Sequence, residues 1–139
     1  MSYGHRVLLA ALATILPLGG ALAAGDNYFP PNPYDQRFCA GLAQQFRSEN
    51  AARIACTSAT TAIVVEYFDY WPEAVGQSLA LAARTGLAPG IVLVCRNDHR
   101  HCENAAAAVV QAFAHSATPL ALWDCSLTDA SLSDCDKLQ

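Results

Sequence analysis

The sequence predicts a mainly α-helical fold, a small disulfide-stapled helical bundle that follows a signal peptide. Three observations lead to this prediction. Apolar residues recur with a helical period through residues 35–46 and again through residues 89–116. An uncharged apolar run stands near the amino terminus. All six cysteines follow that run, as is typical of a domain stapled in an oxidising compartment.

The first 24 residues have the organisation of a secretory signal peptide. Residues 1–6 are short and mildly positive, residues 7–16 are an uncharged apolar run, and small residues follow at positions 21–24; these are the three parts of such a signal. The run is too short to span a bilayer, which needs about 20 apolar residues. We predict cleavage after Ala23 or Ala24, a periplasmic or secreted location, and no membrane contact after cleavage.

Composition excludes two broad classes of protein. Apolar residues make up 53% of the 139-residue chain, too many for a long disordered protein. The eight Lys and Arg residues are spread along the chain and are outnumbered by twelve Asp and Glu residues, which gives a net charge of −4. Nucleic acid is therefore not an expected partner. The rest of the chain is long enough for one domain with a modest core, which we place at residues 35–139.

An extended lead-in is expected before that domain. Residues 25–34 contain three prolines, which disfavour a helix. The aromatic residues Tyr28, Phe29 and Tyr34 would either contact a partner or fold back over the domain's own core.

Three helices are expected in the first half of the domain. The first covers residues 35–46, whose apolar side chains recur at every fourth position. Ser48 is the expected N-cap of the second, which covers residues 51–71 although its second half is rich in β-formers. The third covers residues 74–84 and ends at Gly86, a residue suited to the position after a helix.

Residues 89–116 allow two interpretations. As one long helix with Pro89 in its first turn, they keep an inner apolar stripe and an outer polar stripe throughout. As part of an α/β fold, residues 91–94 and 120–123 are buried strands, and with residues 63–65 they give apolar centres about every 28 residues, as βαβ units would. The helical period favours the single helix. An α/β fold with a small three-stranded parallel sheet is the alternative.

The cysteines distinguish these interpretations. Cys95 and Cys102 would lie roughly 10.5 Å apart along a continuous helix, beyond the roughly 7 Å between Cα atoms that a disulfide allows. An intact helix therefore directs them to other partners, of which Cys39 and Cys56 are the natural choices. A bridge between Cys95 and Cys102 would instead require a break between them and favour the α/β interpretation.

We expect all six cysteines to form three structural disulfides. Cys125 and Cys135 would close a small carboxyl-terminal loop under either interpretation. The chain has no C-x-x-C motif of the kind found in thioredoxin-type redox sites.

A polar run between Cys95 and Cys102 is the densest group of candidate metal ligands. Asp98, His99 and His101 could bind a metal if they stood in a loop. On a helix, His99 and His101 would point about 200° apart and could not share one ion. We therefore predict no metal and no cofactor.

Three acids are candidates for general acid and base catalysis. Glu66, Asp69 and Glu73 fall on one stripe if the chain is helical there, which is the reason for predicting a helix over residues 51–71. Such a stripe is typical of a solvated helix face, and the chain has no nucleophile motif. We predict a non-catalytic protein. A small secreted hydrolase that uses Glu66 or His99 is the least favoured alternative.

The carboxyl-terminal segment is a candidate contact for a partner. Asp124, Asp129, Asp134 and Asp136 stand there with Lys137 as the one basic residue. These carboxylates could meet a basic surface, where complementary charge speeds association, or form a solvated acidic end.

Several short segments loosely resemble one family. Phe38-Cys39-Ala40-Gly41, Ile54-Ala55-Cys56, Val64-Val65-Glu66-Tyr67-Phe68, Trp71-Pro72-Glu73 and the later Cys95 are similar to the Rap/Tai group. These periplasmic immunity proteins inhibit peptidoglycan-amidase effectors of type VI secretion and are small, helical and disulfide-bonded. The resemblance spans about half of the expected mature chain and implies a protein that caps an effector's active site.

Together these features predict an exported, non-catalytic domain that binds another protein. The resemblance suggests an immunity protein or inhibitor of an envelope-acting effector. The alternative is a structural accessory subunit of a bacterial envelope or secretion complex. The sequence leaves the oligomeric state and the identity of the partner open.

Overall fold

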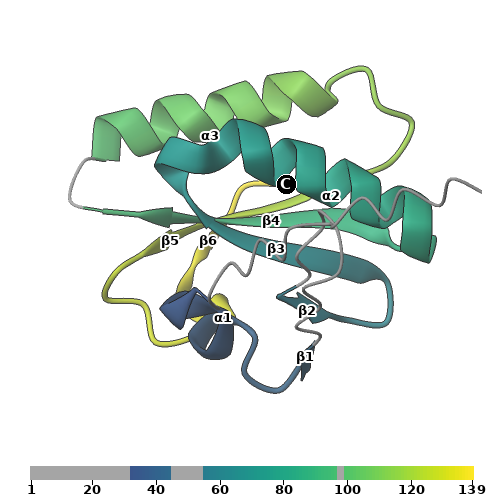
Figure 1. The fold of residues 1–139 in the computed structure, drawn as a ribbon. Coiled ribbons are helices and arrows are strands. Elements are labelled where there is room, and N and C mark those ends of the chain that lie inside the picture. Colours follow the sequence, from purple (N-terminus) through teal and green to yellow (C-terminus); the bar gives the residue numbers. More distant parts are fainter. Residues whose placement is uncertain (1–31, 45–54, 97–98) are drawn as a thin grey trace, which may run out of the picture.

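The computed structural model describes residues 32–44, 55–96 and 99–139, which form an α/β fold (Figure 1). The strands are β1 (Ala43–Gln44), β2 (Cys56–Thr57), β3 (Thr61–Tyr67), β4 (Ala88–Cys95), β5 (Ala121–Ser126) and β6 (Asp136–Lys137). The helices are α1 (Pro33–Phe38), α2 (Trp71–Thr85) and α3 (His99–Phe113), with two short 3₁₀ helices, η1 (Phe68–Tyr70) and η2 (Leu132–Asp134).

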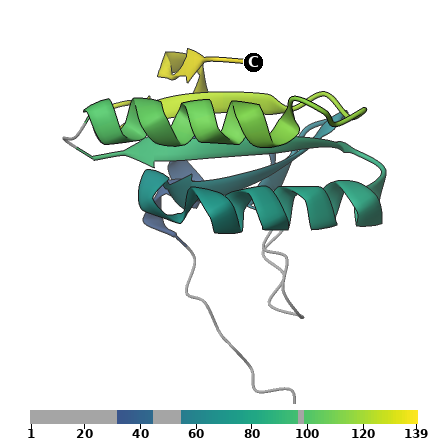
Figure 2. The ribbon, with the colours of Figure 1, turned by 90° about the horizontal axis from the view of Figure 1, so that it is seen from above.

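The described strands form one mixed sheet. They are ordered as in the sequence, from β1 to β6. The central strands β3, β4 and β5 are parallel, whereas β1, β2 and β6 pair antiparallel with their neighbours. Helix α2 connects β3 to β4, and α3 connects β4 to β5. Both connections advance in the same direction along the sheet, and such crossovers are right-handed, so both helices lie on one face of the sheet. Helix α1 lies on the other face (Figures 1 and 2).

The sheet is buried on both faces. In β4, Ile91 and Leu93 pack beneath the two long helices, while Val92 and Val94 pack on the opposite side with Phe38 of α1. All four β4 side chains are fully buried. A strand covered on both faces is apolar at every position, and this run therefore lacks the alternation of a half-exposed strand.

The predicted mainly α-helical bundle is wrong, because the centre of the molecule is a mixed sheet and the protein is α/β. Residues 63–65, 91–94 and 120–123 do fall in or beside three parallel strands, as in the alternative interpretation. The sheet is larger than that alternative because β1, β2 and β6 extend it at both edges.

The predicted helix over residues 51–71 is replaced, in its described part, by β2, β3 and η1. The β-branched run from Ile63 to Val65 favours a strand, and both faces of that strand are covered. The acidic stripe was misleading, because Glu66 lies on β3 and Asp69 on η1.

The predicted single helix over residues 89–116 is divided into β4 and α3. Its apolar first third is a buried strand, and only its second part has the periodicity of a helix. Strand β4 ends at Cys95 and α3 begins at His99, so the chain reverses direction between Cys95 and Cys102.

Helix α1 is shorter than predicted and begins two residues earlier. The Asn32 side chain accepts a hydrogen bond from the Tyr34 backbone N–H at 3.1 Å, and Pro33 stands in the first turn. Pro33 and Tyr34 are thus helical and do not belong to an extended lead-in. The helix ends at Phe38, and Gly41 soon follows with a φ of 81°, a value that suits glycine.

Helix α2 ends where the sequence predicts. Gly86 is its C-cap, with a φ of 71°, and its N–H donates a hydrogen bond to Ala82 O. The helix begins at Trp71, earlier than predicted, because Pro72 fits within its first turn. Also outside the described residues are the signal peptide, Tyr28, Phe29, residues 45–46 of the predicted first helix and the Ser48 cap.

Candidate protein-binding groove

Three disulfides are present, as predicted. They join Cys39 to Cys56, Cys95 to Cys102, and Cys125 to Cys135, with Cα–Cα distances of 5.7, 5.7 and 4.6 Å. The bridge between Cys95 and Cys102 is the one that the α/β interpretation required, and the last pair closes the carboxyl-terminal loop. Three disulfides are compatible with an oxidising, extracytoplasmic environment. Among the described residues, no helix combines the length and apolarity needed to span a membrane.

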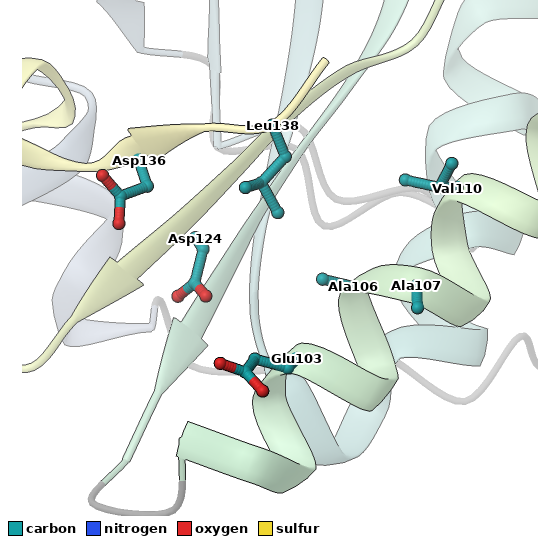
Figure 3. A pocket seen from close by; sticks show the side chains of 7 residues that line it. All are labelled: Glu103, Ala106, Ala107, Val110, Asp124, Asp136 and Leu138. Atoms are coloured by element: carbon teal, nitrogen blue, oxygen red, sulfur yellow. The ribbon is translucent and has the colours of Figure 1, made fainter.

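A groove runs between α3 and the edge of the sheet formed by β5 and β6 (Figure 3). Its volume is about 490 Å³. Its lining is Glu103, Ala106, Ala107 and Val110 of α3, Asp124 of β5, Asp136 of β6, and Leu138 just after β6. Val110 and Leu138 are exposed to 37% and 48%.

The groove exists because the sheet extends further than its helical cover. Helix α2 packs over β3 and β4, and α3 packs over β4 and β5. Strand β6 pairs with the outer edge of β5 and lies beyond α3. The groove-facing positions 106 and 107 of α3 are alanines, so the helix leaves open the space beside the edge strands.

Carboxylates gather at one end of this groove. Asp124 and Asp136 are directly paired across β5 and β6, and Glu103 of α3 faces them in Figure 3. Burial and the negative charge of Asp136 raise the pKa of Asp124 above its ordinary value, whereas His99 lowers that pKa. Among the described residues that line the groove, none is basic, so no lining residue neutralises these carboxylates.

Asp124 also contacts the neighbouring disulfide. Its Oδ1 atom lies 2.7 Å from Cys95 Sγ and 3.7 Å from Cys102 Sγ. These three residues bring potential metal ligands within 4.8 Å of one another, as do Cys125, Asp129 and Cys135. Both cysteine pairs are disulfides, and a disulfide provides no thiolate, the form of cysteine that binds metals.

The predicted acidic tail is divided by the fold. Asp124 and Asp136 meet in the groove, whereas the other two acids make local hydrogen bonds. Asp129 Oδ2 accepts from the Ser126 N–H at 2.7 Å. Asp134 Oδ2 accepts from the Ser131 N–H at 3.0 Å and caps η2. Only half of the predicted set is therefore gathered at one site.

Tyr34, the one predicted aromatic contact within the described residues, packs against the protein itself. Its ring stacks on Phe38 with centroids 6.0 Å apart and meets Tyr67 edge-on at 5.7 Å. Arg37 lies over the Tyr34 ring, 5.1 Å from its centroid. Tyr34 therefore covers part of the core, as in the second of the two roles expected for it.

The candidate catalytic and metal-binding residues do not form the predicted groupings. Glu66, Asp69 and Glu73 lie on β3, η1 and α2, so the common helical stripe does not exist. Asp69 is 3.9 Å from Arg96 in an exposed ion pair. His99 and His101 are exposed in the first turn of α3, two positions apart. Side chains with this spacing on a helix point in different directions. Asp98 lies outside the described residues.

Sequence reasoning missed five of the groove residues: Glu103, Ala106, Ala107, Val110 and Leu138. The helical period placed Glu103 on an outer stripe and Ala106 on an inner one. The register of α3 over β5 was the missing information, because it sets these residues beside an edge strand.

Comparison with known proteins gives no significant match to a family model, a curated protein or a solved structure.

Proposed function

We propose that this protein is an exported, non-catalytic domain that binds another protein through the groove between α3 and β6. The observation that carries the proposal is the combination, in one groove, of two exposed apolar side chains with three carboxylates. Val110 and Leu138 are two of the four large apolar side chains exposed among the described residues. Apolar and charged side chains in one groove offer a partner the two kinds of contact that protein interfaces combine.

The charge of the groove supports a partner with a basic surface. Exposed carboxylates steer a basic partner during association, and a complementary pair then sets the register of the complex. The proposal keeps Asp124 and Asp136 as partner contacts.

The biological role we propose is inhibition of, or immunity to, an envelope-acting effector. Its support is the predicted signal peptide and the three disulfides. The resemblance to the Rap/Tai group implied a helical protein, whereas this chain is α/β, so the resemblance is not counted as support. An inhibitor of this kind needs a rigid surface to cap the effector, and the groove is built on a helix and a strand joined to the disulfide-stapled core.

Affinity capture with matched variants tests the proposed function. The tagged protein is used to capture partners from envelope and secreted fractions, alongside Val110→Asp in the groove and Leu79→Asp as the control. Leu79 is similarly exposed, at 44%, but lies on α2 away from the groove. We expect one partner to be captured by the wild type and by Leu79→Asp, and to be lost with Val110→Asp.

Two results would contradict the proposal. Equal capture by wild type and Val110→Asp would show that the groove is not the binding surface. A clean monomer that captures nothing from either fraction would argue against a binding function altogether.

A further inference from the structure

We propose that the groove takes an amphipathic helix of the partner, with a Lys or Arg side chain placed among the three carboxylates. This inference rests on the proposed function and specifies the chemistry of the partner. It follows from the shape of the uncovered sheet edge and from the charge of the groove.

The layered fold provides a place for a helix. Helices α2 and α3 lie side by side on one face of the sheet (Figure 2), but no described helix covers the corresponding face of β6. A helix that lies beside α3 would complete this layer at the usual interaxial distance of about 8–10 Å. Ala107 presents only a methyl group to the groove and the neighbouring Ala106 is buried in the core, so no large side chain of α3 at these positions keeps another helix away.

The apolar part of the groove matches the apolar face of such a helix. Val110 lies on α3 and Leu138 follows β6, on the two sides of the groove (Figure 3). Both are partly exposed in the isolated protein. Docking a helix between them would remove apolar surface from water, which is the main driving force of helix-in-groove recognition.

The acidic end of the groove selects a cation. Asp124 and Asp136 face each other across two strands, and like charges in directly opposite positions are destabilising. The nearby Lys137 does not relieve this repulsion, because its Nζ lies 5.9 Å from the Trp123 ring, which packs on the opposite face of the sheet. His99 acts on Asp124 but does not line the groove, and one histidine does not balance three carboxylates. A Lys or Arg from the partner could lay its aliphatic stem along the alanines while its charged end reaches the carboxylates.

A second copy of this chain is a poorer occupant. In a symmetric dimer the same patch meets itself, and the described residues that line the groove are acidic or apolar. Two such grooves would bring carboxylates against carboxylates. Charge complementarity therefore favours a different, basic partner.

Stapled peptide helices test the proposal on the whole protein as it stands after cleavage of the predicted signal peptide. One peptide has a Leu/Ala face with a central Lys, and a second has norleucine in place of that Lys. Binding is followed by NMR amide shifts at low and high salt. We expect the Lys helix to shift the signals of Ala106, Ala107 and Val110, to bind about tenfold tighter than the norleucine helix, and to weaken as salt increases.

Charge variants isolate the role of the carboxylates. Asp136→Asn should weaken binding of the Lys helix about threefold to tenfold and leave the norleucine helix unchanged. Glu73→Gln removes an exposed carboxylate from the first turn of α2, outside the groove, and should change neither affinity.

Three results would overturn the inference: equal binding of the two helices, amide shifts elsewhere on the protein, or tighter binding of an extended Lys peptide of the same composition. Concentration-dependent dimerisation through Val110 would also overturn it in favour of a second copy. These failures differ from failure of the proposed function, because Val110→Asp would still abolish partner capture if the groove binds a partner of other chemistry.

Discussion

Asp124 on β5 lies directly opposite Asp136 on β6 in an antiparallel pair. Side chains in opposite positions of such a pair project from the same face with Cβ atoms about 4.5–5.5 Å apart. The backbone register therefore holds two carboxylates close together on the floor of the groove. A neutral side chain at either position would remove the repulsion between them.

Asp136→Asn should stabilise the free protein. The substitution removes one of the two opposed charges, and we expect a gain of about 0.2–1 kcal/mol in the free energy of unfolding, toward the lower end because Asp136 is exposed. Urea titration near neutral pH measures it. Glu73→Gln removes the same charge elsewhere and should give no gain, so an equal gain in both variants would assign the effect to net charge alone.

Asp124 should make stability depend on pH in an unusual direction for an aspartate. Its pKa in the folded protein lies above the ordinary 3.8, so the folded state binds this proton more tightly than the unfolded state does. The contribution of this group is therefore most favourable below about pH 3.8 and decreases as the pH rises through the folded pKa.

The matched variant is Asp124→Asn. The free energy of unfolding of the variant, relative to that of the wild type, should increase between about pH 3 and about pH 7. Urea titrations at several pH values measure this difference. A difference that is constant over the whole range would contradict the raised pKa.

The disulfide pairing predicts a simple peptide map. Trypsin cleaves after Lys and Arg, and the denatured but unreduced protein should give two linked sets: residues 38–47 joined to 54–84, and residues 85–96 joined to 101–137. The second set should also contain an internal bridge. Mass spectrometry before and after reduction identifies both. A link between residues 38–47 and 85–96 would contradict the fold at the end of β4.

Gly90→Ala should destabilise the sheet. A Cβ atom at this position of β4 would lie 2.6 Å from Thr61 Cγ2 and 3.1 Å from Ile63 Cγ1 on β3. Overpacking of this kind costs about 1–3 kcal/mol, which chemical denaturation measures. Thr61→Ser removes Cγ2, so the double variant should recover part of the loss. No recovery would indicate that Ile63 or the backbone sets the limit.

Local sequence signals predicted the features that depend on a few neighbouring residues. Gly86 ends α2 in the left-handed conformation because glycine has no Cβ to clash there. The loop closed by Cys125 and Cys135 is short in sequence, so the two residues meet under either fold. The pairing of Cys95 with Cys102 was correctly linked to the α/β alternative, because disulfide geometry and helix rise are both known in advance.

The choice between those folds was not predicted correctly, for a physical reason. Val92 and Val94 are buried on one face of the sheet while Ile91 and Leu93 are buried on the other. A strand covered on both sides therefore has the same apolar composition as a buried helix segment. Glu66 and Asp69 are three positions apart, as on one face of a helix, but β3 ends between them. Their spacing therefore indicated a helix that does not form.

The sequence by itself determined an even set of cysteines, an acidic carboxyl-terminal segment and the end of α2, because each depends on residue type or on close neighbours. Only the tertiary structure decided which acids meet. The register of β5 with β6 and the position of α3 on the sheet bring Asp124, Asp136 and Glu103 together. Asp129 and Asp134 instead accept hydrogen bonds within local turns. The groove is a product of long-range packing, and no short sequence pattern encodes the distance between a helix face and an edge strand.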